Sequence, residues 1–261
     1  MNMTGSDQQE LISVILPVYN SAGTIEESVS SVLKQTYDNL ELIIVDDASA
    51  DNTGGICRLL SERDSRIRII TNLSNCGTLK ARIRAASEAK SEWIAFIDAD
   101  DRWHPQKLEK QLALRDSSGS DLVYTASAFI DGSGRPYDWI MHVPGDVSYR
   151  QLLKQNIISN SSVLIRRRDY IRYSPSEDNT VNMHEDFACW LCMLRDGLTA
   201  HGIDEPLITY RVSKSSSTGS KLKAASMNMN TYRYIGLGFF SRLFYEACYM
   251  VNGLRKHRHF R

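Results

Sequence analysis

The sequence lacks several features that would assign it at once to a simple class. No stretch approaches about 20 uninterrupted apolar residues, which argues against a membrane-spanning helix. The polar start, MNMTGSDQQE, has neither the basic nor the apolar region of a secretory signal peptide. The 31 basic and 31 acidic residues cancel, and the core shows no basic groove pattern for nucleic acid. We therefore expect a cytoplasmic protein with a folded core and no nucleic-acid partner.

Cysteine is scarce, and its spacing predicts no disulfide framework. The five cysteines are an odd and scattered set, which fits a reducing compartment. Cys189 and Cys192 form a CxxC with no second pair nearby, inside a helical pattern. We interpret them as packing residues on a helix, with a zinc or redox role as the alternative.

What the sequence does contain is a regular alternation of strand and helix patterns. Short β-branched runs are followed by stretches with helical spacing of apolar residues, which predicts βαβ units and a parallel sheet. No GxGxxG follows the first run, which argues against a dinucleotide-dependent dehydrogenase. The expected strands are 11–19, 40–47, 66–71 and 92–98, and the expected helices are 22–36, 51–64 and 77–90.

The alternation loosens in the second half of the chain. Gly and Pro mixed with aromatic residues over 131–146 predict a hairpin or a mobile loop. Gly197 should end the helix that carries the CxxC. The remaining expectations are helices at 104–116, 184–197 and from about 220 onward, and strands at 121–130, 159–167 and 205–212.

Acidic side chains gather where the fourth expected strand ends. The stretch EWIAFIDADDRWHP finishes an apolar run with Asp98, Asp100 and Asp101. Like charges this close repel each other unless a positive group lies among them. Two carboxylates two positions apart in an extended backbone point the same way and suit Mg²⁺ or Mn²⁺ completed by waters and substrate phosphates. Capping of the following helix by Asp100 or Asp101 is the structural alternative.

Polar residues also follow the first two expected strands, at the sheet edge where open parallel sheets bind ligands. The first strand ends at Pro17 and Tyr19, and the second ends at Asp47. Tyr19 offers a flat face for a base, although packing is the commoner role of such a tyrosine. Asp47 could accept hydrogen bonds from a base N–H or a ribose hydroxyl, with a turn carboxylate as the alternative.

Two expected helices begin with groups suited to a phosphate or to proton transfer. The helix after Gly77 carries Arg82 within its first turns, where phosphate is favoured. Glu185 and Asp186 lead the helix at 184–197, where the helix dipole favours acids in any case. If Asp186 faces the acidic edge, it is a candidate general base for a hydroxyl group.

Taken in order, these motifs resemble the family 2 glycosyltransferases. The matching segments are ISVILPVYN, SVLKQT, ELIIVDDASADNT, NCGTLKAR, FIDADD, HEDF and YRVSKSSS, which span residues 11 to about 220. The resemblance implies an inverting enzyme with the GT-A fold, an α/β architecture with a Rossmann-like, mostly parallel central sheet flanked by helices. The catalytic domain would be 1–220, with a nucleotide-sugar half at about 11–117 and an acceptor half at about 118–220. Residues 221–261 would form a C-terminal helical and basic extension.

The resemblance also implies a role for each matching residue. Tyr19 and Asp47 would hold the nucleotide base, Arg82 would lie near the nucleotide, and Asp98 would contact the ribose side. The full implied nucleotide-sugar set is Pro17, Tyr19, Asp47, Arg82, Asp98 and Ala99.

The metal and the catalytic groups follow from the same resemblance. Asp100, with Asp98, would bind Mn²⁺ or Mg²⁺ bridging the donor diphosphate, and Asp186 would deprotonate the acceptor hydroxyl with Glu185 beside it. Many relatives carry a His after the late YR, where it can serve as a metal ligand. Here the residue is Ser213, which puts the third protein ligand in doubt.

Within the family, the sequence resembles bacterial enzymes that extend O-antigen or exopolysaccharide repeat units. The implied reaction moves a hexose from a UDP-sugar to a sugar acceptor linked to a lipid diphosphate. A nucleotide-sugar-forming nucleotidyltransferase is the alternative, but the loop PVYNSAGT after the first strand lacks the Lys or Arg that it would need. A non-catalytic nucleotide-binding assembly subunit on the same scaffold is a second alternative.

The end of the chain mixes aromatic and aliphatic residues with basic ones. FFSRLFYEACYMVNGLRKHRHFR (239–261) has the composition of a basic amphipathic helix, which lies at anionic interfaces. We expect peripheral attachment to the cytoplasmic face of the inner membrane, with a solvated tail or a homo-oligomer contact as the alternative.

Overall fold

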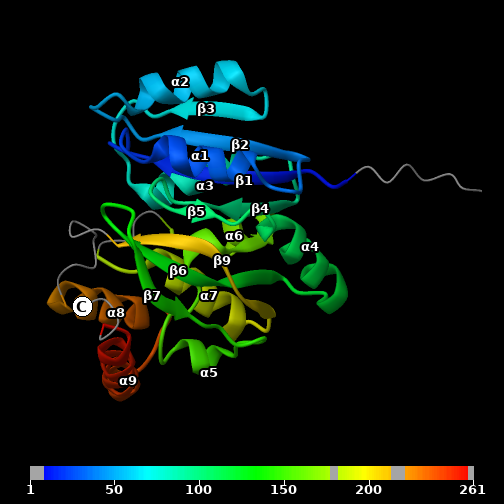
Figure 1. The fold of residues 1–261 in the computed structure, drawn as a ribbon. Helices are drawn as coiled ribbons and strands as arrows, with labels where there is room; N and C mark the ends of the chain where they lie inside the picture. The colour runs from blue at the N-terminus through cyan, green and yellow to red at the C-terminus, as the bar shows by residue number, and fades with distance from the viewer. Residues whose placement is uncertain (1–8, 177–181, 213–220, 258–261) are drawn as a thin grey trace, which may run out of the picture.

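All nine strands of the described chain join in a single sheet (Figure 1). The computed structural model describes residues 9–176, 182–212 and 221–257. The order is β3-β2-β1-β4-β8-β6-β9-β5, and β7 pairs with β6 outside this path. The strands are β1 (Ile12–Val18), β2 (Leu40–Asp46), β3 (Ile67–Thr71), β4 (Trp93–Phe96), β5 (Arg102–Trp103), β6 (Leu122–Asp131), β7 (Pro136–Met141), β8 (Leu164–Arg166) and β9 (Ala200–Val212).

Helices cover both faces of the sheet (Figure 1). They are α1 (Ile25–Leu33), α2 (Thr53–Arg63), α3 (Thr78–Glu88), α4 (Lys107–Ser118), α5 (Tyr149–Leu152), α6 (Arg167–Tyr173), α7 (Glu185–Arg195), α8 (Lys221–Tyr234) and α9 (Phe239–His257), with a 3₁₀ turn, η1, at Asn160–Ser162.

The two-residue period of the strands divides the core into two layers. In β1, Ile12, Val14 and Leu16 pack into the layer that contains α1 and α4, whereas Ile15 packs into the layer of α3 and α7. All seven residues of β1 and of β2 are buried, because helices cover both faces of these strands. This explains why their sequences are continuous apolar runs rather than alternating patterns.

The α/β class is confirmed, but parallel pairing is confined to parts of the sheet. β3, β2, β1 and β4 are parallel neighbours, and so are β6 and β9. β8 is antiparallel to both β4 and β6, and β5 and β7 pair antiparallel with their neighbours. The periodicity that predicts a parallel sheet comes from the βαβ units of the first half, and these units end at β4.

In the second half, the expectations hold for the main elements and fail at one strand. Residues 131–146 contain the turn and the second strand of a hairpin, since β7 pairs with β6 around a turn at Gly134. Gly197 follows α7 with φ of 92°. The strand expected at 159–167 is wrong in its first half, where the backbone forms η1 before β8. Cys189 and Cys192 are free thiols buried on α7, as expected of packing residues. The division into a nucleotide-sugar half and an acceptor half stays a prediction.

Gly202 provides a test of how tightly β9 packs against β6. A Cβ at this position would overlap the carbonyl oxygen of Pro144 and lie 2.9 Å from the Tyr124 ring, whose hydroxyl donates to that same carbonyl. We expect Gly202→Ala to lower the free energy of unfolding by about 1–3 kcal/mol, because the core has no room for the methyl group. Urea unfolding monitored by circular dichroism measures the change.

Gly132 is the matched control, since a Cβ there meets no atom within 4 Å. Gly132→Ala should leave the unfolding midpoint nearly unchanged. Equal midpoints for the two variants would contradict the close approach at Gly202.

Candidate active site

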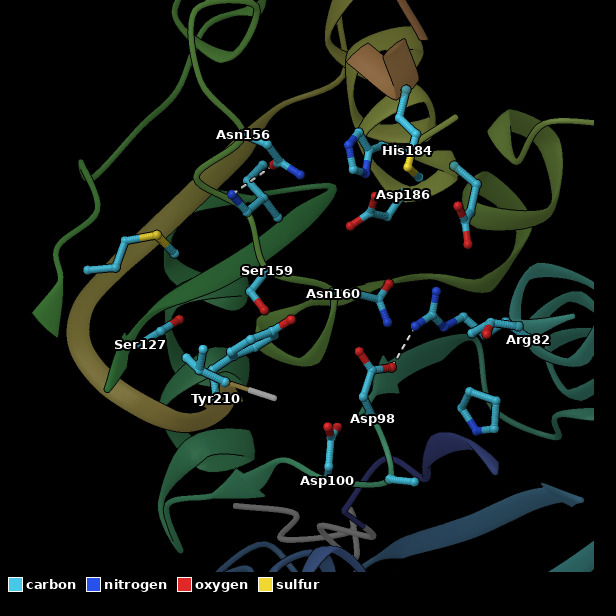
Figure 2. A pocket seen from close by; sticks show the side chains of 18 of the residues that line it. Arg82, Asp98, Asp100, Ser127, Asn156, Ser159, Asn160, His184, Asp186 and Tyr210 are labelled. Carbon is cyan, nitrogen blue, oxygen red and sulfur yellow. Dashed lines mark hydrogen bonds and ion pairs between the residues drawn. The ribbon is translucent and has the colours of Figure 1, made fainter. Parts of the chain in front are cut away.

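A cavity of about 900 Å³ opens at the carboxyl ends of the strands. With one exception, every residue implied by the sequence borders it. These are Pro17, Tyr19, Arg82, Asp98, Ala99, Asp100, Glu185 and Asp186. They come from segments up to 169 positions apart in the chain, and the fold brings them to one place. Figure 2 shows Asp98 and Asp100 on one side of the cavity and Asp186 across from them.

Asp47 is the exception, because its carboxylate is engaged within its own surroundings. Oδ1 accepts hydrogen bonds from the Asn72 amide (2.6 Å) and the Cys76 backbone N–H (3.0 Å), and Oδ2 accepts from the Gly77 N–H (2.8 Å). Burial acts to raise the pKa of Asp47, but these hydrogen bonds outweigh it and hold the pKa below its usual value. In this structure the side chain braces the loop before α3, and its role toward a base stays a prediction.

Asp98 and Asp100 are the acidic side chains of the β4 end that border the cavity. The Arg82 guanidinium lies 2.5 Å from Asp98 Oδ1 (Figure 2). Burial, followed by the charge of Asp98, raises the pKa of Asp100. Asp100 therefore sits where negative charge is costly, and a cation would relieve that cost.

Asp101 does not cap the following helix, and neither does Asp100. α4 begins at Lys107 after Gln106, which makes no side-chain cap. Asp101 is instead fully buried, where it accepts from the Ser161 hydroxyl (2.5 Å) and the Arg211 N–H (3.1 Å). Burial and the nearby carboxylates raise its pKa well above the usual range. Asp101 thus ties three separate segments together behind the cavity, and the capping alternative is wrong.

The η1 turn contacts both Arg82 and the segment 98–101, which we call the acidic turn. Ser161 Oγ accepts from the Asp98 N–H at 3.0 Å while donating to Asp101. The Asn160 amide also faces the Arg82 guanidinium, and when its oxygen is assigned to that side it accepts from Arg82 Nη2 and Nε at 3.2 Å each. The sequence NSS did not predict this role, because we interpreted these residues as the start of the strand expected at 159–167. Their only signal was a cluster of small polar residues within an apolar stretch.

Arg82 is a buried cation surrounded by acidic and polar groups. Burial alone would lower its pKa, but the charge of Asp98, with Tyr170 and Glu185 beyond it, makes the net shift upward. The side chain therefore stays charged and fixes Asp98 in the cavity wall. A buried ion pair of this kind positions groups more than it stabilises the fold.

Arg211, at the end of β9, holds the acidic turn from the other side. Its Nε donates to the Asp100 carbonyl (3.1 Å) and its N–H to Asp101, while its Nη2 bonds Glu27 of α1 at 2.7 Å. Arg102 binds the same Glu27 oxygen but lies nearer the surface. Arg211 belongs to the late YR motif, yet its contact with the turn was not expected from the sequence.

The start of α7 places three titratable groups at the cavity. Burial, followed by the charge of Asp186, raises the pKa of Glu185. Burial lowers the pKa of His184, so the imidazole is neutral near pH 7. Asp186 Oδ1 accepts from the Phe187 N–H at the helix N-terminus, which supports a carboxylate at this position. The carboxylate lies across the cavity from Asp98 and Asp100 (Figure 2).

The chain offers an incomplete ligand set for a divalent cation. Within the described residues, no group of three or more His, Cys, Asp or Glu side chains is arranged to hold a metal ion. Asp98 and Asp100 are hard oxygen donors, and burial, followed by the charge of Asp98, raises the pKa of Asp100. Two carboxylates with remaining positions taken by phosphates and water suit Mg²⁺ or Mn²⁺. Ser213, at the doubtful third-ligand position, lies outside the described residues.

Comparison with known proteins identifies the family. Residues 13–180 match the model described as glycosyl transferase family 2, which is more than half of the chain. The chain belongs to glycosyl transferase family 2. Its relatives in this family are glycosyltransferases, and membership decides against the nucleotidyltransferase alternative.

The family relatives align over nearly the whole chain. TuaG of Bacillus subtilis (strain 168) is 34% identical over 94% of this chain and 97% of its own. Its name describes it as a teichuronic acid biosynthesis glycosyltransferase. WfgD of Escherichia coli, a UDP-Glc:alpha-D-GlcNAc-diphosphoundecaprenol beta-1,3-glucosyltransferase, is 33% identical over 95% of each chain. WfaP of Escherichia coli carries the same activity in its name and is 32% identical over 95% of this chain and 96% of its own. This glycosyltransferase therefore resembles enzymes of bacterial polysaccharide synthesis.

Solved structures show the same fold, which is GT-A. S. aureus TarS 1-349 in complex with UDP-GlcNAc matches with a TM-score of 0.70 and 21% identity, over 92% of this chain and 71% of that chain. Mannosyltransferase PcManGT from Pyrobaculum calidifontis, in complex with GDP-Man and Mn²⁺, matches with a TM-score of 0.67 and 18% identity, over 91% and 68%.

The contacts of Arg211 predict a positioning role at the acidic turn. For a site that binds a nucleotide together with Mn²⁺, Arg211→Met should raise the Mn²⁺ concentration needed for half-maximal nucleotide binding by about tenfold, because the lost bond to the Asp100 carbonyl lets the turn move. Titration calorimetry of UDP at several Mn²⁺ concentrations measures this without any turnover.

Arg102→Met is the control for the loss of an arginine from Glu27, since the Arg102 side chain bonds Glu27 and, among the described residues, makes no hydrogen bond to the acidic turn. It should leave the Mn²⁺ dependence of UDP binding unchanged. The same shift in both variants would show that Glu27, rather than the Asp100 contact, controls the turn.

Proposed function

We propose that this protein is an inverting, metal-dependent hexosyltransferase that moves a sugar from a UDP-sugar to a hydroxyl of a lipid-diphosphate-linked sugar. The observation that carries the proposal is that Asp98, Asp100 and Asp186 border the same cavity. In this proposal the donor diphosphate binds at Asp98 and Asp100, opposite Asp186 as the general base. The substrate classes are taken from the relatives WfgD and WfaP, whose names specify UDP-Glc and GlcNAc-diphosphoundecaprenol.

Asp186 is the proposed base. As the acceptor oxygen attacks the anomeric carbon, its proton passes to the Asp186 carboxylate, and the bond between that carbon and the diphosphate oxygen breaks. One in-line displacement inverts the anomeric centre. Glu185, with its pKa raised by burial, is suited to a hydrogen bond with the acceptor.

Asp98 and Asp100 are the proposed holders of Mn²⁺ or Mg²⁺ at the donor diphosphate. When bound, the ion supplies charge stabilisation for the leaving nucleoside diphosphate. Arg82 fixes Asp98 through their ion pair, and Arg211 fixes the Asp100 backbone. Tyr19, half exposed at the rim, offers the nucleotide base an aromatic face.

Replacement of the proposed base tests the mechanism. We expect Asp186→Asn to lower the rate of transfer by about 10²- to 10⁴-fold while leaving UDP binding intact, because the amide cannot accept the acceptor proton. Release of nucleoside diphosphate is measured with UDP-, GDP- and dTDP-sugars, with Mn²⁺, Mg²⁺ or EDTA, and with a synthetic sugar–diphosphate–lipid acceptor.

Asp196→Asn, at the opposite end of α7, is the matched control and should transfer at the wild-type rate. Full activity in Asp186→Asn would contradict the role of Asp186 as the base. Equal activity in EDTA and in Mn²⁺ would contradict metal dependence.

We also propose that α9 attaches the enzyme to an anionic membrane surface. Phe240, Leu243 and Phe244 form an exposed apolar face at helical spacing, and Phe240 is 84% exposed. The other side of α9 packs Tyr245 against the core and brings Tyr249 to the cavity. The same helix thus connects the cavity wall with an apolar surface, an arrangement suited to a lipid-linked acceptor. In the described part of the chain, no helix is long and apolar enough to cross a membrane.

The basic residues on which the sequence argument for membrane attachment depended lie mostly at 255–261. The structure describes no side chains there. The apolar face of α9 therefore carries the proposal, and the basic end stays a prediction.

Removal of the apolar face tests the membrane proposal. We expect the double variant Phe240→Ser, Phe244→Ser to bind vesicles of phosphatidylglycerol and phosphatidylethanolamine at least about tenfold more weakly, since each ring would lose its burial in the interface. Cosedimentation with vesicles measures the change.

The control is the double variant Leu59→Ser, Leu73→Ser, which removes two exposed apolar side chains far from α9 in the chain. It should bind vesicles as the wild type does. Unchanged vesicle binding by the α9 variant, or a change from dimer to monomer instead, would assign the face to another role.

A further inference from the structure

A buried hydroxyl at the cavity, that of Ser127, has no hydrogen-bond partner among the described residues. Ser127 of β6 borders the cavity and is fully buried, yet its hydroxyl makes no hydrogen bond within the described part of the chain. A buried hydroxyl carries a desolvation penalty, and no hydrogen bond within the described chain offsets it at Ser127. The hydroxyl is therefore suited to a partner that is not part of the chain.

The sheet is distorted at the position that presents this hydroxyl. Between β6 and β9 the register shifts twice, so that Thr125 pairs with Ile203 while Ser127 pairs with Ile208. Irregularities of this kind re-aim side chains beside functional sites. On the other side, Ser127 pairs with Met141 of β7, so both side chains lie on the same face of the sheet, and both border the cavity.

Aromatic rings continue this wall. Phe129, two positions along β6, has its ring centroid 5.8 Å from that of Tyr210 and stacks on Trp139 at 4.9 Å. Phe129 and Tyr210 border the cavity together with Ser127 and Met141. Burial raises the pKa of Tyr210, so the phenol stays neutral and can donate a hydrogen bond.

The wall differs in charge from the rest of the cavity. In Figure 2, Ser127 and Tyr210 lie on the opposite side from Arg82, with Asp98 and Asp100 between the two sides and lower in the view, and Asp186 above. The wall residues named above carry no charge, whereas a diphosphate would need the cationic and metal-binding side. Apolar and aromatic surface with a few fixed hydroxyls is the chemistry that binds a neutral pyranose ring.

We propose that Ser127, Phe129, Met141 and Tyr210 form the subsite for the acceptor sugar, with the Ser127 hydroxyl bonded to one polar substituent of that sugar. The inference rests on the proposed function and adds the residue that selects the acceptor. A site built to bond one substrate hydroxyl discriminates strongly against analogues that lack it, because its own buried group is then left unpaired. Ser127 would therefore select which sugar presents its nucleophilic hydroxyl to Asp186.

The test compares Ser127→Ala with the wild type on a synthetic N-acetylhexosaminyl diphosphate lipid and on analogues that each lack one hydroxyl or the N-acetyl group. We expect Ser127→Ala to lower kcat/KM for the intact acceptor about tenfold, with the KM for the UDP-sugar unchanged within about twofold. One analogue should be a poor substrate for the wild type. Ser127→Ala should show the same kcat/KM for that analogue as for the intact acceptor. The Tm of the variant should be unchanged or higher, because an unpaired hydroxyl has been removed.

Ser133→Ala is the control, since Ser133 lies in the turn of the same hairpin and bonds only Asp131 in the described structure. It should behave as the wild type with every acceptor. A rise in the UDP-sugar KM of Ser127→Ala would assign the hydroxyl to the donor, and a lower Tm with unchanged kinetics would make it structural. Either result overturns the inference while wild-type transfer still stands, whereas failure of the wild type with all donors would overturn the proposed function itself.

Discussion

Three carboxylates within four residues have to be held at one edge of the sheet, and much of the chain is arranged around that constraint. Asp101 is withdrawn into the core and bonded by Ser161 and the Arg211 backbone. Asp98 is paired with Arg82, and Asp100 is left facing the cavity with a raised pKa. Each of the three carboxylates thus has a different environment. The negative charge of Asp100 at the cavity makes this position suited to a cation.

The groups that support this turn come from distant parts of the chain. Ser161 of η1 bonds the Asp98 backbone, and Arg82 of α3 bonds the Asp98 carboxylate. Arg211, at the end of β9, bonds the Asp100 carbonyl. Arg211 also bonds Glu27 and so connects the turn to α1. Because each support is itself buried and bonded, the geometry at the sheet edge is set by packing rather than by the local sequence. Such preorganisation is what a site needs to hold charged groups close together before substrate arrives.

The cavity divides by charge into two sides, and this division follows from the sheet. The parallel half, β3-β2-β1-β4, ends in the polar and acidic residues expected at the carboxyl edge of such a sheet. The other half, where β6 pairs with β7 and β9, contributes the uncharged aromatic wall. In the proposed function, the charged donor meets the first kind of surface and the neutral acceptor sugar meets the second.

The sequence by itself determined the βαβ units, the acidic strand end and the acid pair at the start of α7, because these depend on local periodicity and on residue types at element ends. It also determined the family, through motifs that recur in order. It did not determine the antiparallel placement of β8, the η1 turn, the burial of Asp101 or the engagement of Asp47. Each of these depends on which segments become neighbours: Asp101 has its partners 60 and 110 positions away, and Ser127 borders the cavity beside a register shift that no local pattern marks. Only the tertiary structure decides such pairings, since a hydrogen bond or a bulge between distant strands leaves no period in the sequence of either one.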